Sequence, residues 1–155
     1  MKIASTLGIL ALTLVSQYTL AADTTPSSTP QRARDAYLQR YDAAKERQDW
    51  AGAASVMNEA VASNPGNADY HNLYAYSLRK SGAKDMDLVF KHYNEALRID
   101  PRHRGAHEYL GEAYLMVGNV EKAKEQLGAL DKLCFFGCEE YSDLKTAIST
   151  YEAKR

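Results

Sequence analysis

The sequence predicts an all-α protein built as a stack of three helix pairs and a final helix, about seven helices with no strands. Residues 71–82, HNLYAYSLRKSG, and residues 107–118, HEYLGEAYLMVG, share a first His, a large apolar fourth residue, a small fifth residue and a final Gly, 36 residues apart. Apolar residues then recur every three or four positions, which is typical of an amphipathic helix. A composition of 45% hydrophobic and 25% charged residues indicates one globular domain.

The second helix of each copy carries three apolar positions at fixed spacing, and two copies then reach a proline. Proline terminates the helix before it. The spacing is identical in the middle and upstream copies: Val89, Tyr93, Ala96 and Pro101 match Ala53, Met57, Ala60 and Pro65. The third copy has Phe135 where the proline is expected.

This order of helix, turn, helix and proline, with a period of 34 to 36 residues, resembles the tetratricopeptide repeat (TPR). The resemblance covers residues 34–135 and implies a right-handed α-solenoid. The third copy matches best, and its small residues Gly111 and Ala123 are expected to let the two helices of that pair approach closely. The first copy is atypical, since Arg40 and Tyr41 stand where a leucine and a small residue are expected.

The predicted organisation has six segments. They are a signal peptide at residues 1–22, a polar linker at 23–30, three TPR repeats at 31–66, 67–102 and 103–135, and a capping helix at 136–155. Thr29 as cap and Pro30 at the first helical position predict the start of the first helix. Leu144 and Ile148 share the apolar face of the capping helix, which is expected to cover the end of the third repeat.

The first 22 residues have the pattern of a signal peptide. Lys2 precedes an apolar run from Ile3 to Val15, and small residues follow. The run is shorter than the roughly 20 apolar residues that span a bilayer. We therefore expect cleavage after Ala21 or Ala22, without stable membrane insertion afterwards. The short, weakly charged leader is typical of bacteria and predicts a periplasmic or secreted protein. The mature chain keeps 18 basic and 20 acidic residues, a balance that gives no indication of nucleic-acid binding.

The residues with chemical potential are few. Cys134 and Cys138 are the two cysteines, and an exported chain meets an oxidising compartment, so a disulfide is predicted, with Gly137 making the loop flexible. A redox or metal-handling protein centred on these cysteines with His103 and His107 stays open as the alternative, since two Cys and two His can ligate zinc. The main interpretation has no metal or cofactor. No catalytic triad, phosphate loop or paired-carboxylate motif occurs, so no enzyme is predicted.

The TPR resemblance implies a concave groove, lined by the first helices, that binds a segment of another protein. We interpret the chain as an exported scaffold or adaptor that binds an envelope or secreted protein, in complex assembly. The groove positions carried over from the family are Leu38, Asp42, Asn72, Tyr76, Arg79, Glu108, Glu112, Leu115 and Met116, and more widely Asp35, Lys45 and Asp69.

The Lys and Asn clamp with which some TPR proteins hold a terminal carboxylate is absent. The corresponding places hold Leu38, Asp42, Leu73, Gly105 and Tyr109. Carboxylates outnumber the basic residues Lys45 and Arg79, which favours a ligand with basic or polar groups. Self-association through an exposed repeat edge stays open.

Overall fold

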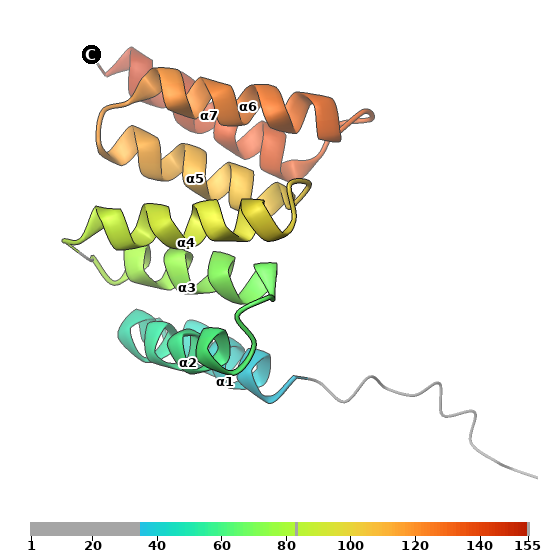
Figure 1. Cartoon of the computed structure of the whole chain (residues 1–155). Helices are drawn as coiled ribbons and strands as arrows, with labels where there is room; N and C mark the ends of the chain where they lie inside the picture. Colours follow the sequence, from blue (N-terminus) through green and yellow to red (C-terminus); the bar gives the residue numbers. More distant parts are fainter. Residues whose placement is uncertain (1–34, 83, 155) are drawn as a thin grey trace, which may run out of the picture. The chain divides into compact units, whose positions relative to one another are not determined.

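The computed structural model describes residues 35–82 and 84–154, which form seven helices and no strand (Figure 1). The helices are α1 (Ala36–Glu46), α2 (Trp50–Ser63), α3 (Ala68–Lys80), α4 (Met86–Ile99), α5 (Arg104–Met116), α6 (Val120–Leu133) and α7 (Glu139–Ala153). The prediction of an all-α solenoid with seven helices is confirmed. The predicted signal peptide and linker lie outside the described residues.

The helices form consecutive pairs, α1 with α2, α3 with α4 and α5 with α6. Each helix packs on the next one along the chain, so the pairs stack in sequence order. Helix α5 also packs on α3 and on α7. In Figure 1, α4 and α6 lie in front of α3 and α5, which places second helices in one layer and first helices in another. Helix α7 therefore takes the place beside α5 that the first helix of a further repeat would take.

Each second helix begins at an Asp or Asn that caps it. The side chains of Asp49, Asp85 and Asn119 accept hydrogen bonds from backbone N–H groups three residues ahead, at 2.8, 3.1 and 3.1 Å. These bonds satisfy donors that the first helical turn leaves without a partner. The turns before the caps contain Gly82 and Gly118 with φ of 77° and 78°. The first turn instead holds Gln48 in this left-handed region, at φ 56°.

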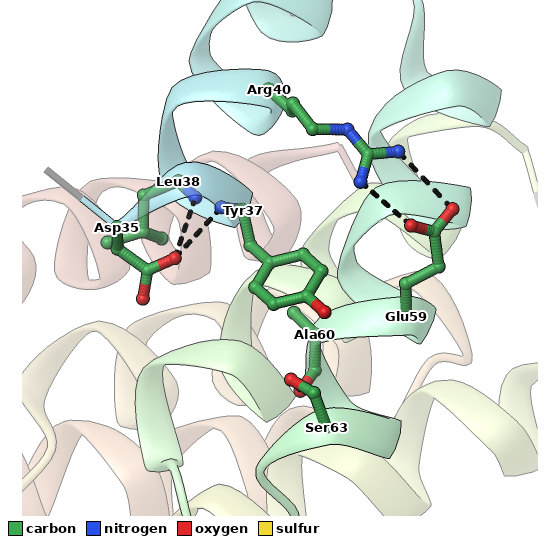
Figure 2. Close-up of polar contacts among 7 residues, drawn as sticks. All are labelled: Asp35, Tyr37, Leu38, Arg40, Glu59, Ala60 and Ser63. Carbon is green, nitrogen blue, oxygen red and sulfur yellow. Dashed lines mark hydrogen bonds and ion pairs between the residues drawn. The ribbon is translucent and has the colours of Figure 1, made fainter.

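Helix α1 begins at Ala36, with Asp35 as its cap. The Asp35 carboxylate accepts from the N–H groups of Tyr37 and Leu38 at 2.9 and 3.4 Å, which fixes the start (Figure 2). Thr29 and Pro30 lie outside the described residues. Arg40, which departs from the family pattern, donates to the Glu59 carboxylate at 2.8 and 3.3 Å and so joins α1 to α2 (Figure 2).

The core consists of three clusters, one for each junction along the stack. Each cluster takes residues from a helix pair and from a neighbouring helix, so most apolar contacts are local in sequence. The clusters are built around Tyr41, Met57 and Tyr70, around Val89, Tyr93 and Leu110, and around Leu115, Leu130, Leu144 and Ile148. Tyr41 is buried although its position in the family pattern takes a small residue.

Gly111 makes room for a side chain of α7. A Cβ atom at Gly111 would lie 2.6 Å from Cδ2 of Leu144, a distance at which atoms overlap. We did not predict this contact, since we expected Gly111 to serve the close approach of α5 and α6. The close neighbour is the fully buried Leu144 of α7, which packs directly on the glycine.

Two buried histidines occupy equivalent places at the starts of α3 and α5. His71 Nε2 lies 3.0 Å from the Pro65 carbonyl oxygen, and His107 Nε2 lies 3.1 Å from that of Pro101. The other ring nitrogen of each reaches the second helix of its own pair. His71 Nδ1 lies 2.8 Å from His92 Nδ1, and His107 Nδ1 lies 2.8 Å from Gln126 Oε1. Each ring therefore connects the preceding turn, the first helix and the second helix.

We predict that Gln48→Gly stabilises the protein by about 0.5 to 1 kcal/mol. A non-glycine residue in the left-handed region costs about 1 to 2 kcal/mol, which the greater freedom of glycine in the unfolded chain partly offsets. Urea unfolding measures the change. The reverse substitution Gly82→Gln, at a positive φ with open space around it, serves as the control and is expected to destabilise. Destabilisation by Gln48→Gly would contradict the assignment.

We predict that His92 makes folding sensitive to pH between about 6.5 and 4. Burial, and then the charge of His71, lower the pKa of His92 from 6.5 to about 4. Between pH 6.5 and 4, His92 is therefore protonated in the unfolded chain but not in the folded protein. The free energy of unfolding falls as the pH falls, by about 2 to 3 kcal/mol. Urea unfolding at pH 7 and 4.5 should show a smaller loss for His92→Gln than for the wild type. Equal losses would exclude this role.

Candidate functional site

A hollow of about 320 Å³ lies where the first helices of all three pairs converge. We call it the inner hollow. Its lining comes from α1, α3 and α5: Leu38, Tyr41, Asp42, Lys45, Leu73, Tyr76 and Tyr109. Two leucines and three tyrosines make most of this surface apolar or aromatic, and exposed Asp42 and Lys45 add one charge of each sign. Such a concave surface with few charged groups suits a bound side chain or peptide.

Tyr76 lies between two other aromatic rings, those of Tyr109 and Trp50, and we call these three rings the aromatic wall. Its ring centroid lies 4.6 Å from that of Tyr109 on α5 and 5.6 Å from that of Trp50 on α2. Ring pairs at these separations attract one another beyond their buried area. The wall is therefore held in place before any ligand binds, which lowers the entropy cost of binding.

Arg79 interacts with other residues of the protein. Its side chain is 10% exposed, and its Nη2 lies 2.5 Å from a carboxylate oxygen of Glu112 on α5. The guanidinium carbon lies 5.5 and 5.8 Å from the ring centroids of Tyr76 and Tyr109, within cation–π range. Arg79 and Glu112, both predicted groove contacts, therefore neutralise each other and tie α3 to α5.

The remaining predicted groove residues are divided between surface and interior. Leu38, Asp42 and Tyr76 line the inner hollow, and Met116 is exposed near the end of α5. The prediction that Leu115 contacts a ligand in the groove is wrong. Leu115 is 8% exposed and belongs to the core cluster that contains Leu144 and Ile148, because α7 covers that side of α5.

Other predicted groove residues have structural partners or are buried. Asp35 caps α1 and accepts a hydrogen bond from the Tyr70 hydroxyl. Asp69 lies 3.0 Å from His103 Nε2. Asn72 and Glu108 are both buried, near the hollow rather than in its lining.

Sequence reasoning missed Tyr41 and interpreted Leu73 and Tyr109 only as places where a clamp is lacking. All three line the hollow. The signal for Tyr41 was its departure from the family pattern, since a large aromatic residue at a small position must change the local surface. Burial raises the pKa of Tyr109 to about 12, so its hydroxyl stays protonated at neutral pH.

The predicted grouping of Cys134 and Cys138 with His103 and His107 is not found among the described residues. The Sγ atoms of Cys134 and Cys138 lie 2.08 Å apart, at disulfide distance, and Gly137 has φ 85° in the intervening turn. Within the described part of the chain, Cys134, Cys138 and Glu140 have candidate ligand atoms within 4.8 Å of one another, and His103 and His107 are not among them.

The two histidines have other partners. His103 Nδ1 accepts from the Ala106 N–H and caps α5, and both ring nitrogens of His107 are engaged. The grouping of His103 and His107 with the cysteines is therefore wrong.

Two further hollows lie elsewhere on the described residues. One borders the turn at residues 117–121, and the other lies along α6 between Pro101 and Leu133. Neither joins the first helices of all three pairs. No helix in residues 35–82 or 84–154 is long and apolar enough to span a membrane.

Comparison with known structures identifies the architecture. The TPR2B domain in the pHsp70 complex of yeast Sti1 superposes with a TM-score of 0.68, at 19% identity over 77% of this chain and 95% of that chain. The second TPR domain of human RPAP3, in complex with the HSP70 peptide SGPTIEEVD, gives a TM-score of 0.64, at 17% identity over 75% of this chain and 92% of that one. The chain has the TPR fold.

A curated sequence supports the same fold. The inactive TPR repeat-containing thioredoxin TTL3 of Arabidopsis thaliana is 32% identical over 100 residues, which are 64% of this chain. The chain spans only 13% of the length of that relative. No family model matches the chain.

We predict that Glu112→Gln destabilises the TPR fold by about 2 kcal/mol. It leaves the Arg79 guanidinium, which is nine-tenths buried, without its countercharge. The matched control is Glu125→Gln, which breaks an exposed ion pair with Lys122 and should cost less than about 0.5 kcal/mol. Urea unfolding compares the two variants. Equal small losses would show that the Arg79 charge does not depend on Glu112.

Proposed function

We propose that this chain is a non-catalytic TPR adaptor that binds an extended segment of another protein in the inner hollow. The main support is that α1, α3 and α5 all contribute residues to the hollow, and that Tyr76 and Tyr109 of the aromatic wall belong to its lining. TPR domains of the same fold bind peptide segments, as in the human RPAP3 complex with an HSP70 peptide. A peptide bound here would contact all three repeats.

The ligand we propose is apolar with polar or basic groups rather than acidic. Four of the five places where a clamp would hold a carboxylate are in the lining, and they are Leu38, Asp42, Leu73 and Tyr109. Lys45 adds one positive charge, but Asp42 lies in the same lining and Arg79 is already paired with Glu112. An acidic peptide such as SGPTIEEVD would therefore meet no net positive charge.

We further propose that the adaptor is exported and works in the periplasm or outside the cell, in the assembly of envelope or secreted proteins. The signal-peptide pattern of residues 1–22 supports export. Two cysteine sulfurs at disulfide distance suit an oxidising compartment. The redox or metal alternative receives no support from His103 and His107, whose partners lie elsewhere.

Peptide selection tests the binding proposal. Random 12-residue peptides displayed on phage would be selected on the mature chain, and the affinities of the enriched peptides would then be measured by fluorescence anisotropy. We expect the double variant Asp42→Lys, Lys45→Glu to weaken binding at least tenfold, because both residues are exposed in the lining and their charges are reversed.

The matched control reverses Asp87 and Lys91, which are exposed on α4 outside the hollow, and should leave the affinities unchanged. The peptide SGPTIEEVD serves as a negative probe and should not bind measurably. Equal effects of the two double variants, or tight binding of SGPTIEEVD, would refute the proposed site.

A further inference from the structure

A buried glutamate without a counterion lies on α5 beside the inner hollow. Glu108 is 8% exposed, and within the described residues it has neither a hydrogen bond nor an ion pair. Two of its acidic neighbours differ in this respect, because Glu112 binds Arg79 and Glu140 lies 3.5 Å from Arg104. A buried carboxylate without a partner is costly in the charged form.

The charged groups around Glu108 come from three helices. Burial raises its pKa to about 8, with further increases from Glu112 on the same helix and from Asp143 and Glu140 on α7. Arg79 on α3 acts in the opposite direction. Glu108 is therefore mostly neutral at pH 7 when no ligand is bound.

A second buried acceptor lies where α3 packs on α5, and we call this contact between the two helices the seam. The Oδ1 atom of Asn72 is buried and lacks a hydrogen-bond partner in the described part of the structure. The Asn72 amide packs against Gly105, with Nδ2 3.5 Å from the place of a Cβ atom there. Gly105 precedes Glu108 by three residues, which places both on one side of α5. The seam thus offers one buried acceptor without a donor, Asn72 Oδ1, and one carboxyl group without a cation, and the unmade hydrogen bond of Asn72 has a cost.

We propose that this seam receives a lysine or arginine side chain of the segment bound in the inner hollow, with Glu108 as its carboxylate and Asn72 as its second acceptor. The inference rests on the proposed function, because the hollow supplies the segment. A guanidinium carries five N–H donors and an ammonium three, so one basic side chain can satisfy both acceptors. Calcium is a poorer candidate, since it takes six to eight oxygen ligands and two of the nearby carboxylates already bind arginines.

Entry of the basic side chain releases a proton from Glu108 to solvent. The complex then holds one proton fewer than the separate partners, so its affinity rises with pH. The increase approaches tenfold per pH unit below about pH 8 and ends above it. Binding through a protonated Glu108 that only donates a hydrogen bond would give the opposite slope.

The experiment uses the mature chain with ¹³C-labelled glutamate carboxyl groups and two blocked pentapeptides. One is Ala-Ala-Arg-Ala-Ala, and the other has norleucine in place of arginine. We expect the arginine peptide to move the Glu108 carboxyl resonance to its ionised position at pH 7, with an affinity that rises from pH 6 to 8. Glu108→Gln, which keeps the shape of the neutral acid, should weaken binding at least fivefold, whereas Glu125→Gln, at an exposed site, should not.

Several outcomes would overturn the inference. They are a Glu108 carboxyl resonance that does not shift when the arginine peptide is added, an affinity that is constant or falls as the pH rises, or an equal shift of the Glu108 resonance with calcium chloride at the same concentration. Methyl and ring resonances of Leu38 and Tyr76 report the hollow separately. If they respond to both peptides while Glu108 stays silent, the proposed function stands and this inference fails. If Glu108 responds to arginine while the hollow stays silent, the cation site stands and peptide binding in the hollow fails.

Discussion

The stack depends on two buried histidine rings that each hold three backbone segments together. One nitrogen of His71 or His107 meets the carbonyl oxygen of the proline in the preceding turn, and the other meets the second helix of the same pair. These contacts fix where each first helix starts relative to the repeat before it. The row of first helices, and therefore the inner hollow, follows from that placement. Because the rings are buried, their hydrogen bonds are shielded from competing water.

The fold could be predicted because a solenoid makes its contacts between neighbours in sequence. The apolar spacing of Val89, Tyr93 and Ala96 is enough to define a helix face, and the prolines mark where the helices end. The sequence also shows that Gly111 must be small. It does not show that Leu144, 33 positions later, is the side chain that requires the space, since that depends on the angle at which α7 packs.

The candidate site was only partly predictable. Leu38, Asp42 and Tyr76 follow from the family positions, because the repeat period fixes which side of each first helix faces inward. Leu115 occupies such a position as well, but α7 buries it. Periodicity reports which residues share a face and leaves open what covers that face. The burial of Glu108 depends in the same way on the tertiary contacts of α5 with α3 and α7.

The arrangement around Arg79 has a consequence for how this surface can change in evolution. The guanidinium needs both the Glu112 carboxylate on the next repeat and the two tyrosine rings beneath it. Replacement of either charged partner alone leaves the other charge poorly compensated. Related chains should therefore keep Arg79 and Glu112 together or lose both together, whereas Asp42 and Lys45 at the exposed lining are able to vary singly. The rigid part of the surface would then be inherited as a unit, and ligand preference would diverge at the exposed positions.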